Sequence, residues 1–165
     1  VGSEMCIRDR MEKGRDALAA VERHEVTPAL EDVVEATIYL SGLGFENGGL
    51  AAAHAVNDGF AQEPQAHGMY HGENVAFGTL VQLVLEKAPQ EELEQVLAFL
   101  RNTGLPLTLA QLGVKEIVPE TLKKVAEAAV VPTQSTKNLR ADITAQEVYD
   151  AILEADRIGR DYLAR

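Results

Sequence analysis

Apolar residues recur at helical spacing through almost every segment of this 165-residue chain after Met11. A period of 3.6 residues places such side chains on one face of a helix, whereas a half-buried strand alternates every second residue. The pattern predicts helices near residues 12–24, 28–41, 48–59, 71–88, 89–103, 105–114, 119–131 and 144–165. No segment has the pattern of a strand. We therefore expect an all-α fold, a bundle of about seven or eight helices.

Local signals mark several helix ends. Thr27 stands before a proline, which is the usual order of an N-cap and a first helical residue. Thr144 and Glu147 have the spacing of a capping box, in which each side chain accepts from the other residue's backbone N–H. The glycines Gly42 and Gly44 are expected to end the second helix, because glycine weakens a helix interior.

Composition excludes several classes of function. The net charge of −11 argues against binding to nucleic acid or to an anionic membrane surface, both of which require a basic face. The sequence has neither a long apolar run nor an apolar secretory signal. A single cysteine cannot form an internal disulfide, so a reducing compartment, the cytoplasm, is expected. A small neutral or cationic ligand remains compatible with this charge.

The segment 1–10, "VGSEMCIRDR", lacks both a helical period and a cap. It resembles the translation of a transposase sequencing adaptor, which would encode Val1 through Asp9 and the start of the next codon. A disordered native terminus is the alternative. We therefore expect residues 1–10 to be foreign to the protein and to lie outside its fold. The native domain is expected to span 11–165, as a piece of a longer protein.

Three of the four histidines lie close together in the sequence, between Gly49 and Glu73. His54 falls within the alanine-rich segment "GGLAAAHAVNDG", where it is either a metal ligand or a buried histidine bonded to a carbonyl. His71 precedes the next helix, whose dipole favours the neutral ring that binds metals. His67 lies four residues earlier, a spacing that suits zinc on a helix, although a glycine between them makes a continuous turn doubtful.

Spacing alone leaves this metal site incomplete. Catalytic zinc usually has three protein ligands and an open position. Asp58, four residues after His54, is either a carboxylate partner or a solvated helix end, and the sequence favours the solvated end. His24 has the polar surroundings of a surface residue. The chain contains no nucleophile elbow, no phosphate-binding glycine loop and no native cysteine nucleophile to compete with a metal site.

Two stretches resemble a known family. The segment from Val26 to Gly59, with "SGLGFENGGLAAAHAVNDG", and the segment "HGMYHGENVAFGTLVQLVLEKAP" are similar to the carboxyl-terminal half of the glycerol dehydrogenases. These belong to the metal-dependent (iron-type) alcohol dehydrogenases, whose fold is related to that of dehydroquinate synthase. The resemblance runs from Met11 to Tyr162 and includes "GLPLTLAQLGV". It weakens in "VVPTQSTKNLRADIT".

The resemblance implies a metal-binding helical domain. Two zinc ligands of the family fall on His54 and His71, and an aromatic residue lining the glycerol pocket falls on Phe45. The third ligand, an aspartate, and the NAD-binding domain belong to upstream segments that this chain lacks. The intact enzyme would oxidise glycerol to dihydroxyacetone with zinc and NAD as cofactors, and would form a large homo-oligomer. His67 is a candidate supporting group near the metal.

Two other functions stay open. The same ligand pair would serve a dehydrogenase for another diol or hydroxyketone. A free-standing helical interaction module without catalysis is the alternative from a different class. We expect the present chain alone to be inactive, because the resemblance places the dinucleotide site and the third ligand outside it.

Overall fold

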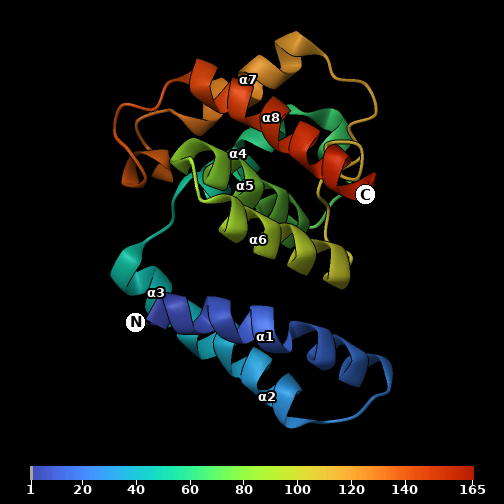
Figure 1. The fold of residues 1–165 in the computed structure, drawn as a ribbon. Coiled ribbons are helices and arrows are strands. Elements are labelled where there is room, and N and C mark those ends of the chain that lie inside the picture. Colours follow the sequence, from blue (N-terminus) through green and yellow to red (C-terminus); the bar gives the residue numbers. More distant parts are fainter. Residues whose placement is uncertain (1) are drawn as a thin grey trace. The chain divides into compact units, whose positions relative to one another are not determined.

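The computed structural model describes residues 2–165, which contain helices, turns and loops but no strand. This confirms the predicted all-α class. Figure 1 shows the helices in chain order. Their bounds are α1 Gly2–Glu22, α2 Pro28–Glu35, a π-helical turn Ala36–Leu40, α3 Ser41–Gly48, α4 Ala52–Gly59, α5 His71–Glu86, α6 Gln90–Thr103, α7 Pro119–Ala129 and α8 Ala145–Leu163. Short 3-10 turns occupy Phe60–Gln62, Pro64–Ala66 and Ser135–Asn138.

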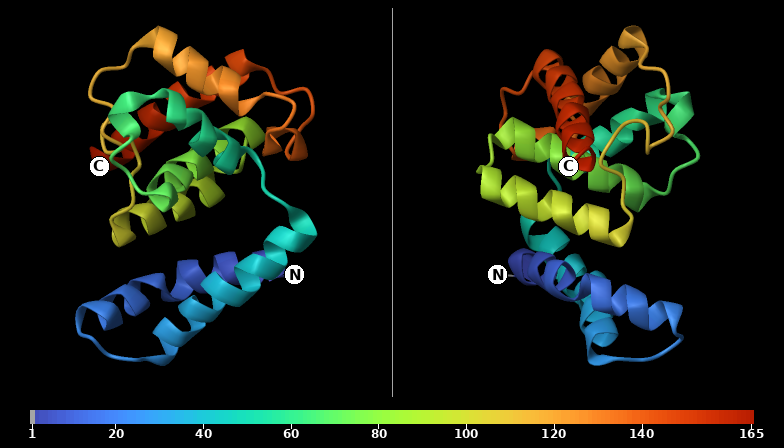
Figure 2. Two further views of the ribbon diagram at one scale, coloured as in Figure 1. Left: turned by 180° about the vertical axis from the view of Figure 1, so that it is seen from behind. Right: turned by 45° about the vertical axis from the view of Figure 1, so that its right-hand side comes forward.

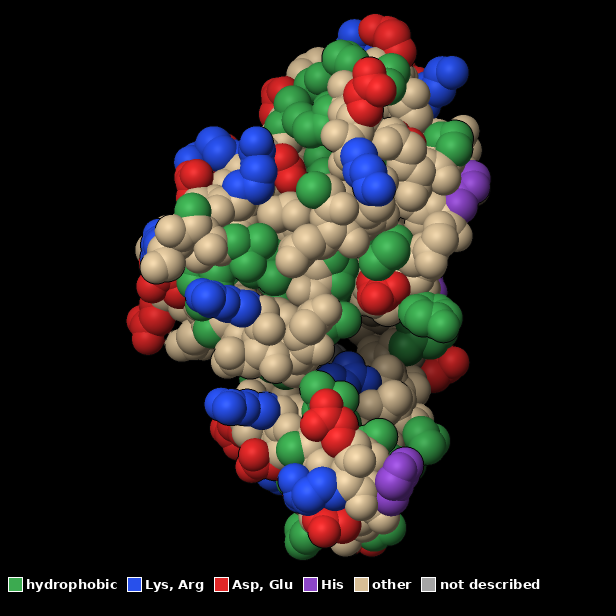
Figure 3. Space-filling view, turned by 90° about the vertical axis from the view of Figure 1, so that its right-hand side faces the viewer, with side chains coloured by type: hydrophobic (Ala, Val, Ile, Leu, Met, Phe, Trp, Pro, Cys, Tyr) green, Lys and Arg blue, Asp and Glu red, His purple; other side chains and the backbone are tan. Residues whose placement is uncertain are grey.

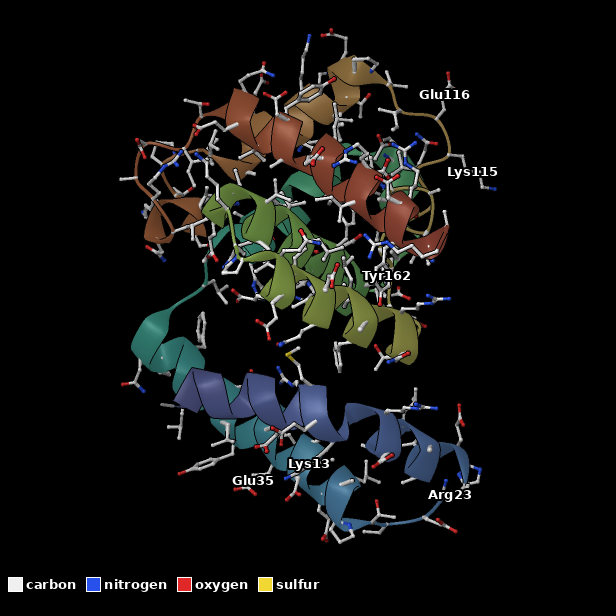
Figure 4. The ribbon with its side chains drawn as sticks, in the orientation of Figure 1. Lys13, Arg23, Glu35, Lys115, Glu116 and Tyr162 are labelled. Carbon is white, nitrogen blue, oxygen red and sulfur yellow. The ribbon has the colours of Figure 1, made fainter. Side chains whose placement is uncertain are left out.

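The chain divides into two units, and the division falls between Gly49 and Leu50. In the first unit α1 packs against α2, the π-helical turn and α3. Three alanines, Ala17, Ala20 and Ala36, are its buried apolar residues among those described. The Nζ atom of Lys13, labelled in Figure 4, lies 2.8 Å from a carboxylate oxygen of α2. Among its described side chains, the first unit therefore has only a small apolar core.

Helix α1 begins at Gly2 rather than near Met11, so the start of the first helix expected from the sequence is wrong. Arg10 donates hydrogen bonds of 3.4 Å to the carbonyl of Ala36 and to the hydroxyl of Thr37. A helix that already exists gains one hydrogen bond for each residue added, so a segment without a period of its own can extend it. Val1 lies outside the described residues. The adaptor origin of 1–10 stays a prediction.

The predicted stop at Gly42 and Gly44 is also wrong. Both glycines lie inside α3, which continues from α2 through the π-helical turn and ends at Gly48. Gly49, with φ of 70°, is the residue that stops it. Each interior glycine costs about 1 kcal/mol relative to alanine, and packing of α3 against α1 offsets this cost. The N-cap at Thr27 is confirmed, since its side chain accepts from the Leu30 N–H.

The second unit holds the main hydrophobic core. Helices α4, α5, α7 and α8 pack against one another, as Figure 1 shows. Phe60 and Phe77 meet edge to face at its centre, with ring centroids 6.1 Å apart. Helix α6 follows α5 after a short turn, and Figure 2 shows the two side by side. This core fixes the positions of α4 and of the start of α5.

Residues 105–114 form turns instead of the predicted short helix. Side chains satisfy the backbone there: Gln111 accepts from the Leu107 N–H at 2.7 Å, and Asp156 accepts from the Leu109 N–H at 2.8 Å. Asp156 is 3% exposed and belongs to α8. A β-carbon at Gly159 would lie 1.9 Å from the Leu107 carbonyl oxygen, so α8 packs directly on this backbone. Leu105, Leu109 and Leu112 are four and three residues apart, which is helical spacing, and this spacing accounts for the wrong prediction.

A second set of side-chain hydrogen bonds, made by Gln65, holds the backbone just after this segment, at Lys115 and Glu116. Gln65 accepts from the backbone N–H groups of Lys115 and Glu116 and donates to the Glu116 carbonyl. The side chains of Lys115 and Glu116 point away from the helices in Figure 4, so their backbones alone make these contacts. Glu63, which is 2% exposed, accepts from the backbone and side chain of Gln65. These hydrogen bonds order the loop although it has no helical structure.

Acidic and basic side chains are interspersed over the face shown in Figure 3. Several of them form ion pairs along single helices; Arg157, for example, contacts Glu154 and Asp161. The capping box at Thr144 and Glu147 is confirmed at the start of α8. None of the helices in residues 2–165 is both long and apolar enough to cross a membrane.

Candidate metal centre

Two of the predicted site residues, His54 and His71, come together in the second unit. Their ring centroids are 5.6 Å apart and the ring planes are inclined by 49°. His54 lies within α4, and His71 is the first residue of α5. Sixteen residues separate them in the sequence, so the packing of α4 against α5 creates the pair.

The backbones of α4 and α5 approach each other closely beside the pair. A β-carbon at Gly78 would lie 2.4 Å from the carbonyl oxygen of Ala53, a distance that side chains do not tolerate. One turn further along α5, Gln82 Oε1 accepts from the Ala53 N–H at 3.1 Å. The residue after Ala53 is His54. The position of this imidazole is therefore set by a direct contact between two helix backbones.

Other side chains hold the start of α4, which has no side-chain N-cap of its own. Ser135 donates to the Ala51 carbonyl at 2.8 Å, and Asn138 donates to the Leu50 carbonyl at 2.8 Å. Gln134 reaches the other end of the helix, where its Nε2 donates to Asp58 at 3.2 Å. Residues 134–138 thus brace both ends of the helix that carries His54. They lie in the loop where the sequence resemblance is weakest.

His71 owes its place to a capping contact. The carboxylate of Glu73 accepts from the backbone N–H of Tyr70 at 2.7 Å, which fixes the turn just before α5. The backbone at Tyr70 is extended, so the helix begins sharply at His71. The ring of His71 is exposed, and that of His54 is half-buried. One imidazole therefore faces solvent while the other lies against the core.

The surroundings of His54 favour its neutral form. Burial lowers its pKa below 6.5, the neighbouring His71 lowers it further, and the carboxylate of Asp58 acts in the opposite direction. Burial is the largest of these effects because it removes water from the charged imidazolium. Neutral imidazole is the form that donates a lone pair to a metal ion. His54 is thus available as a ligand near neutral pH.

The structure separates His67 from this pair. The chain turns between the 3-10 turn Pro64–Ala66 and α5, so His67 and His71 do not share a helix. The Nε2 atom of His67 lies 3.0 Å from the carbonyl oxygen of Ala61, which can only accept, so Nε2 is the donor. The helical zinc pair that the i,i+4 spacing allowed is therefore excluded. A supporting role for His67 near the metal stays a prediction.

Asp58 has the character of a helix end held by neighbours. It is exposed, and it accepts from Asn57 at 3.1 Å and from Gln134 at 3.2 Å. Within the described part of the chain, no group of three or more His, Cys, Asp or Glu side chains is placed to hold a metal ion. The two histidines offer two imidazole donors, whereas a catalytic zinc usually has three protein ligands.

The remaining predicted residue, Phe45, lies on α3 in the first unit. Its ring is 53% exposed. Its place in a glycerol pocket stays a prediction from the sequence resemblance. His24, expected at the surface, is exposed in the same unit and has a left-handed backbone with φ of 55°.

Sequence reasoning missed Gln82 and Asn74, two residues that share a face of α5 with His71. Gln82 holds the backbone of α4, as described above. Asn74 follows His71 by one helical turn, and its Oδ1 atom is buried without a hydrogen-bond partner among the described residues. The positions 71, 74, 78 and 82 share one face of α5, so helical spacing from His71 was the available signal.

No protein-family model matches the chain. It is 53% identical over 161 residues to the glycerol dehydrogenase of Escherichia coli strain CFT073, a match that covers 98% of this chain and 44% of that protein. It is 42% identical to the glycolaldehyde reductase of Halobacterium salinarum, over 96% of this chain and 43% of that protein. The chain spans less than half the length of these relatives.

Solved structures agree with the sequence relatives. The crystal structure of a probable glycerol dehydrogenase from Sinorhizobium meliloti matches with a TM-score of 0.91 and 42% identity, over 96% of this chain and 45% of that one. Sequence identity at this level, together with a shared fold, indicates common descent. The resemblance seen in the sequence is confirmed: the chain is a homologue of the glycerol dehydrogenases and corresponds to a portion of their length.

Proposed function

We propose that this chain is the metal-holding portion of an NAD-dependent dehydrogenase that oxidises glycerol to dihydroxyacetone. The observation that carries the proposal is the pairing of His54 and His71, with ring centroids 5.6 Å apart, in a homologue of the glycerol dehydrogenases. These are the residues on which the zinc ligands of the resembled family fall. The portion of the protein that completes the site lies outside this chain.

The residues present fit a zinc ion as two of its ligands. Imidazole nitrogen suits zinc, and the half-buried His54 is held neutral. The exposed ring of His71 leaves room for further ligands on its side. An aspartate from the remainder of the protein would be the third ligand, and substrate would take the open position. Iron in place of zinc is compatible with the same donors.

The chemistry divides between the cofactors and this chain. Bound zinc would act as a Lewis acid on the hydroxyl groups of glycerol, and NAD would accept the hydride. His54 and His71 hold and orient the metal, while the contact between α4 and α5 keeps their two rings close together. The sequence resemblance implies that Phe45 lines the glycerol pocket. These roles require no proton transfer by His54 or His71, because both rings remain neutral ligands.

A second candidate is a dehydrogenase for another diol or hydroxycarbonyl compound. The observation that favours it is the 42% identity to the glycolaldehyde reductase of Halobacterium salinarum, a value close to that of several glycerol dehydrogenases. The same two histidines would serve both substrates. A panel of polyols and hydroxycarbonyl compounds, with NAD or its reduced form, would rank these activities by kcat/KM.

The assembly and compartment belong to the same proposal. A homo-oligomer in the cytoplasm agrees with the sequence resemblance, and size-exclusion chromatography with light scattering would measure the assembly. The rival, a helical interaction module without catalysis, needs no metal. A chain that bound no zinc through its histidines would favour that rival.

The test uses the E. coli enzyme with the segment that matches this chain exchanged for it. The exchanged enzyme should oxidise glycerol with NAD. His54→Ala or His71→Ala should abolish this activity and lower zinc affinity by more than the roughly 10–100-fold expected for a supporting group. NAD binding should persist, because the dinucleotide site lies in the other portion. The present chain by itself should show no activity.

His67→Ala supplies the matched comparison, because His67 lies four residues before His71 in the sequence but its ring bonds to a carbonyl. It should reduce activity by at most the amount expected of a supporting group. Full zinc occupancy and activity in His71→Ala, with loss of both in His67→Ala, would show that the ligand assignment is wrong.

A further inference from the structure

Asn74 lies on the face of α5 that meets α4. It follows His71 by three residues and precedes Gly78 by four, and Gly78 is the residue whose backbone touches Ala53. Residues three and four apart on a helix share a face. Side chains on a helix lean towards its amino end, so the amide of Asn74 extends towards the turn that carries His71. Asn74 therefore lies on the same side of α5 as the imidazole pair.

The amide oxygen of Asn74 is buried, yet no described residue donates a hydrogen bond to it. It is the one buried side-chain oxygen or nitrogen in the described part of the chain that lacks a partner. Folded proteins satisfy the large majority of such atoms, because an unsatisfied buried acceptor loses its hydration without compensation. A buried acceptor without a partner, one helical turn after His71, indicates that the site itself supplies the donor.

A metal-bound imidazole supplies such a donor. When one ring nitrogen of a neutral histidine binds the metal, the other carries a proton that needs an acceptor. His67 has a backbone acceptor, the Ala61 carbonyl. Among the described residues, neither His54 nor His71 has one. Each ring of the pair thus lacks an acceptor for its N–H among the described residues, and the buried Oδ1 of Asn74 lacks a donor.

We propose that Asn74 is a positioning residue of the metal site, whose Oδ1 accepts a hydrogen bond from an imidazole N–H of the His54–His71 pair when metal is bound. The inference rests on the proposed function, because it needs the two histidines to be ligands. Asn74 touches neither metal nor substrate in this role. It fixes which ring nitrogen carries the proton and how the ring is turned.

The test compares Asn74→Leu with Asn74→Asp in the full 165-residue chain. Zinc affinity is measured by competition with a chromogenic chelator, and stability by urea denaturation without metal. Asn74→Leu should weaken zinc binding roughly 10–100-fold, as losses of such partners typically do. Its metal-free stability should stay equal or rise, because an unsatisfied polar atom is removed. Asn74→Asp keeps an acceptor of the same shape and should bind zinc nearly as well as the original chain.

The two measurements separate this role from simple packing. If Asn74 only fills space, Asn74→Leu lowers the metal-free stability, and any loss of zinc binding follows that loss of stability; that result overturns the inference. Unchanged zinc affinity in Asn74→Leu overturns it as well. Asn102→Leu, at an exposed position of α6, is the control for a general effect of leucine.

The histidine variants distinguish failure of this inference from failure of the proposed function. Zinc binding that is lost in His54→Ala and His71→Ala, but unaffected in Asn74→Leu, rejects the role of Asn74 alone. Zinc binding that is the same in all three variants and in the original chain rejects the metal site itself.

Discussion

At the scale of single residues, His54 makes the metal-free protein sensitive to acid. Its pKa lies below 6.5, chiefly through burial and then through the neighbouring His71, with Asp58 opposing both. The unfolded chain therefore binds a proton more readily than the folded protein does. The stabilising contribution of His54 is complete above pH 6.5 and is lost as the pH falls through the lower folded pKa.

We predict that His54→Asn removes part of the stability loss that the metal-free chain shows between about pH 7 and about pH 5, where histidine titrates. Urea denaturation at several pH values measures this slope. His24→Asn is the control, because His24 is exposed and asparagine tolerates its left-handed backbone. An unchanged slope in His54→Asn would contradict the prediction.

His54 and His71 show which features of the site the sequence can predict and which it cannot. Spacing alone allowed His67 with His71, and the family resemblance was needed to choose His54 instead. Helical periodicity gives the face on which a residue lies but not the helix that this face meets. For the same reason Gln82 and Asn74 went unnoticed, since their roles depend on the contact between α4 and α5.

At the scale of secondary-structure elements, the spacing of α4 and α5 depends on Gly78. A methyl group there would lie 2.4 Å from the Ala53 carbonyl oxygen, which is backbone and cannot turn aside. We predict that Gly78→Ala costs about 1–3 kcal/mol or more of unfolding free energy, as overpacking does. Zinc affinity should fall too, because the displaced α4 carries His54. Urea denaturation and chelator competition measure the two effects.

Gly72 provides the matched control on the same helix. A β-carbon there meets no atom within 4 Å. Gly72→Ala should change the unfolding free energy by about 0.5 kcal/mol or less, as surface substitutions usually do. Equal losses in the two variants would mean that a methyl group added at either glycine destabilises α5, and that close contact at Gly78 is not the cause.

The elements also show which parts of the fold sequence patterns can predict. Helices with clear caps, such as α8 behind Thr144, were predicted with their starts. Gly42 and Gly44 misled because packing outweighs a local propensity of about 1 kcal/mol. The segment 105–114 misled because its buried leucines reach the core from turns whose N–H groups bond to side chains. Turns held by side-chain hydrogen bonds require no regular spacing of apolar residues in the sequence.

At the scale of the whole molecule, the contacts that position the imidazole pair among the described residues belong to the second unit. The main hydrophobic cluster runs from Ala55 to Ala155, and the braces at Gln82 and in residues 134–138 belong to the same unit. We predict that residues 50–165 alone fold and bind zinc within about twofold of the full chain, which is about 0.4 kcal/mol. Circular dichroism and chelator competition test this.

Residues 1–49 alone should behave differently. Their buried apolar residues among those described are Ala17, Ala20 and Ala36, which is too little apolar area to offset the entropy of ordering the chain. We expect this segment to be largely unfolded in isolation. A cooperative melting transition in it, or loss of zinc binding in 50–165, would contradict the division described here.

The irregular segment from Leu105 to Val118, which side-chain hydrogen bonds hold in place, determines where a protease would cut the chain. Irregular loops are usually the places where proteolysis begins, because an enzyme must draw several residues into an extended strand. Here the backbone is tied to Gln65, Gln111 and Asp156, and Leu107, Leu109 and Leu112 are buried. Cleavage would require these ties to break together, which is a sub-global opening rather than a local one. The longest stretch without regular structure should therefore be among the last to be cut.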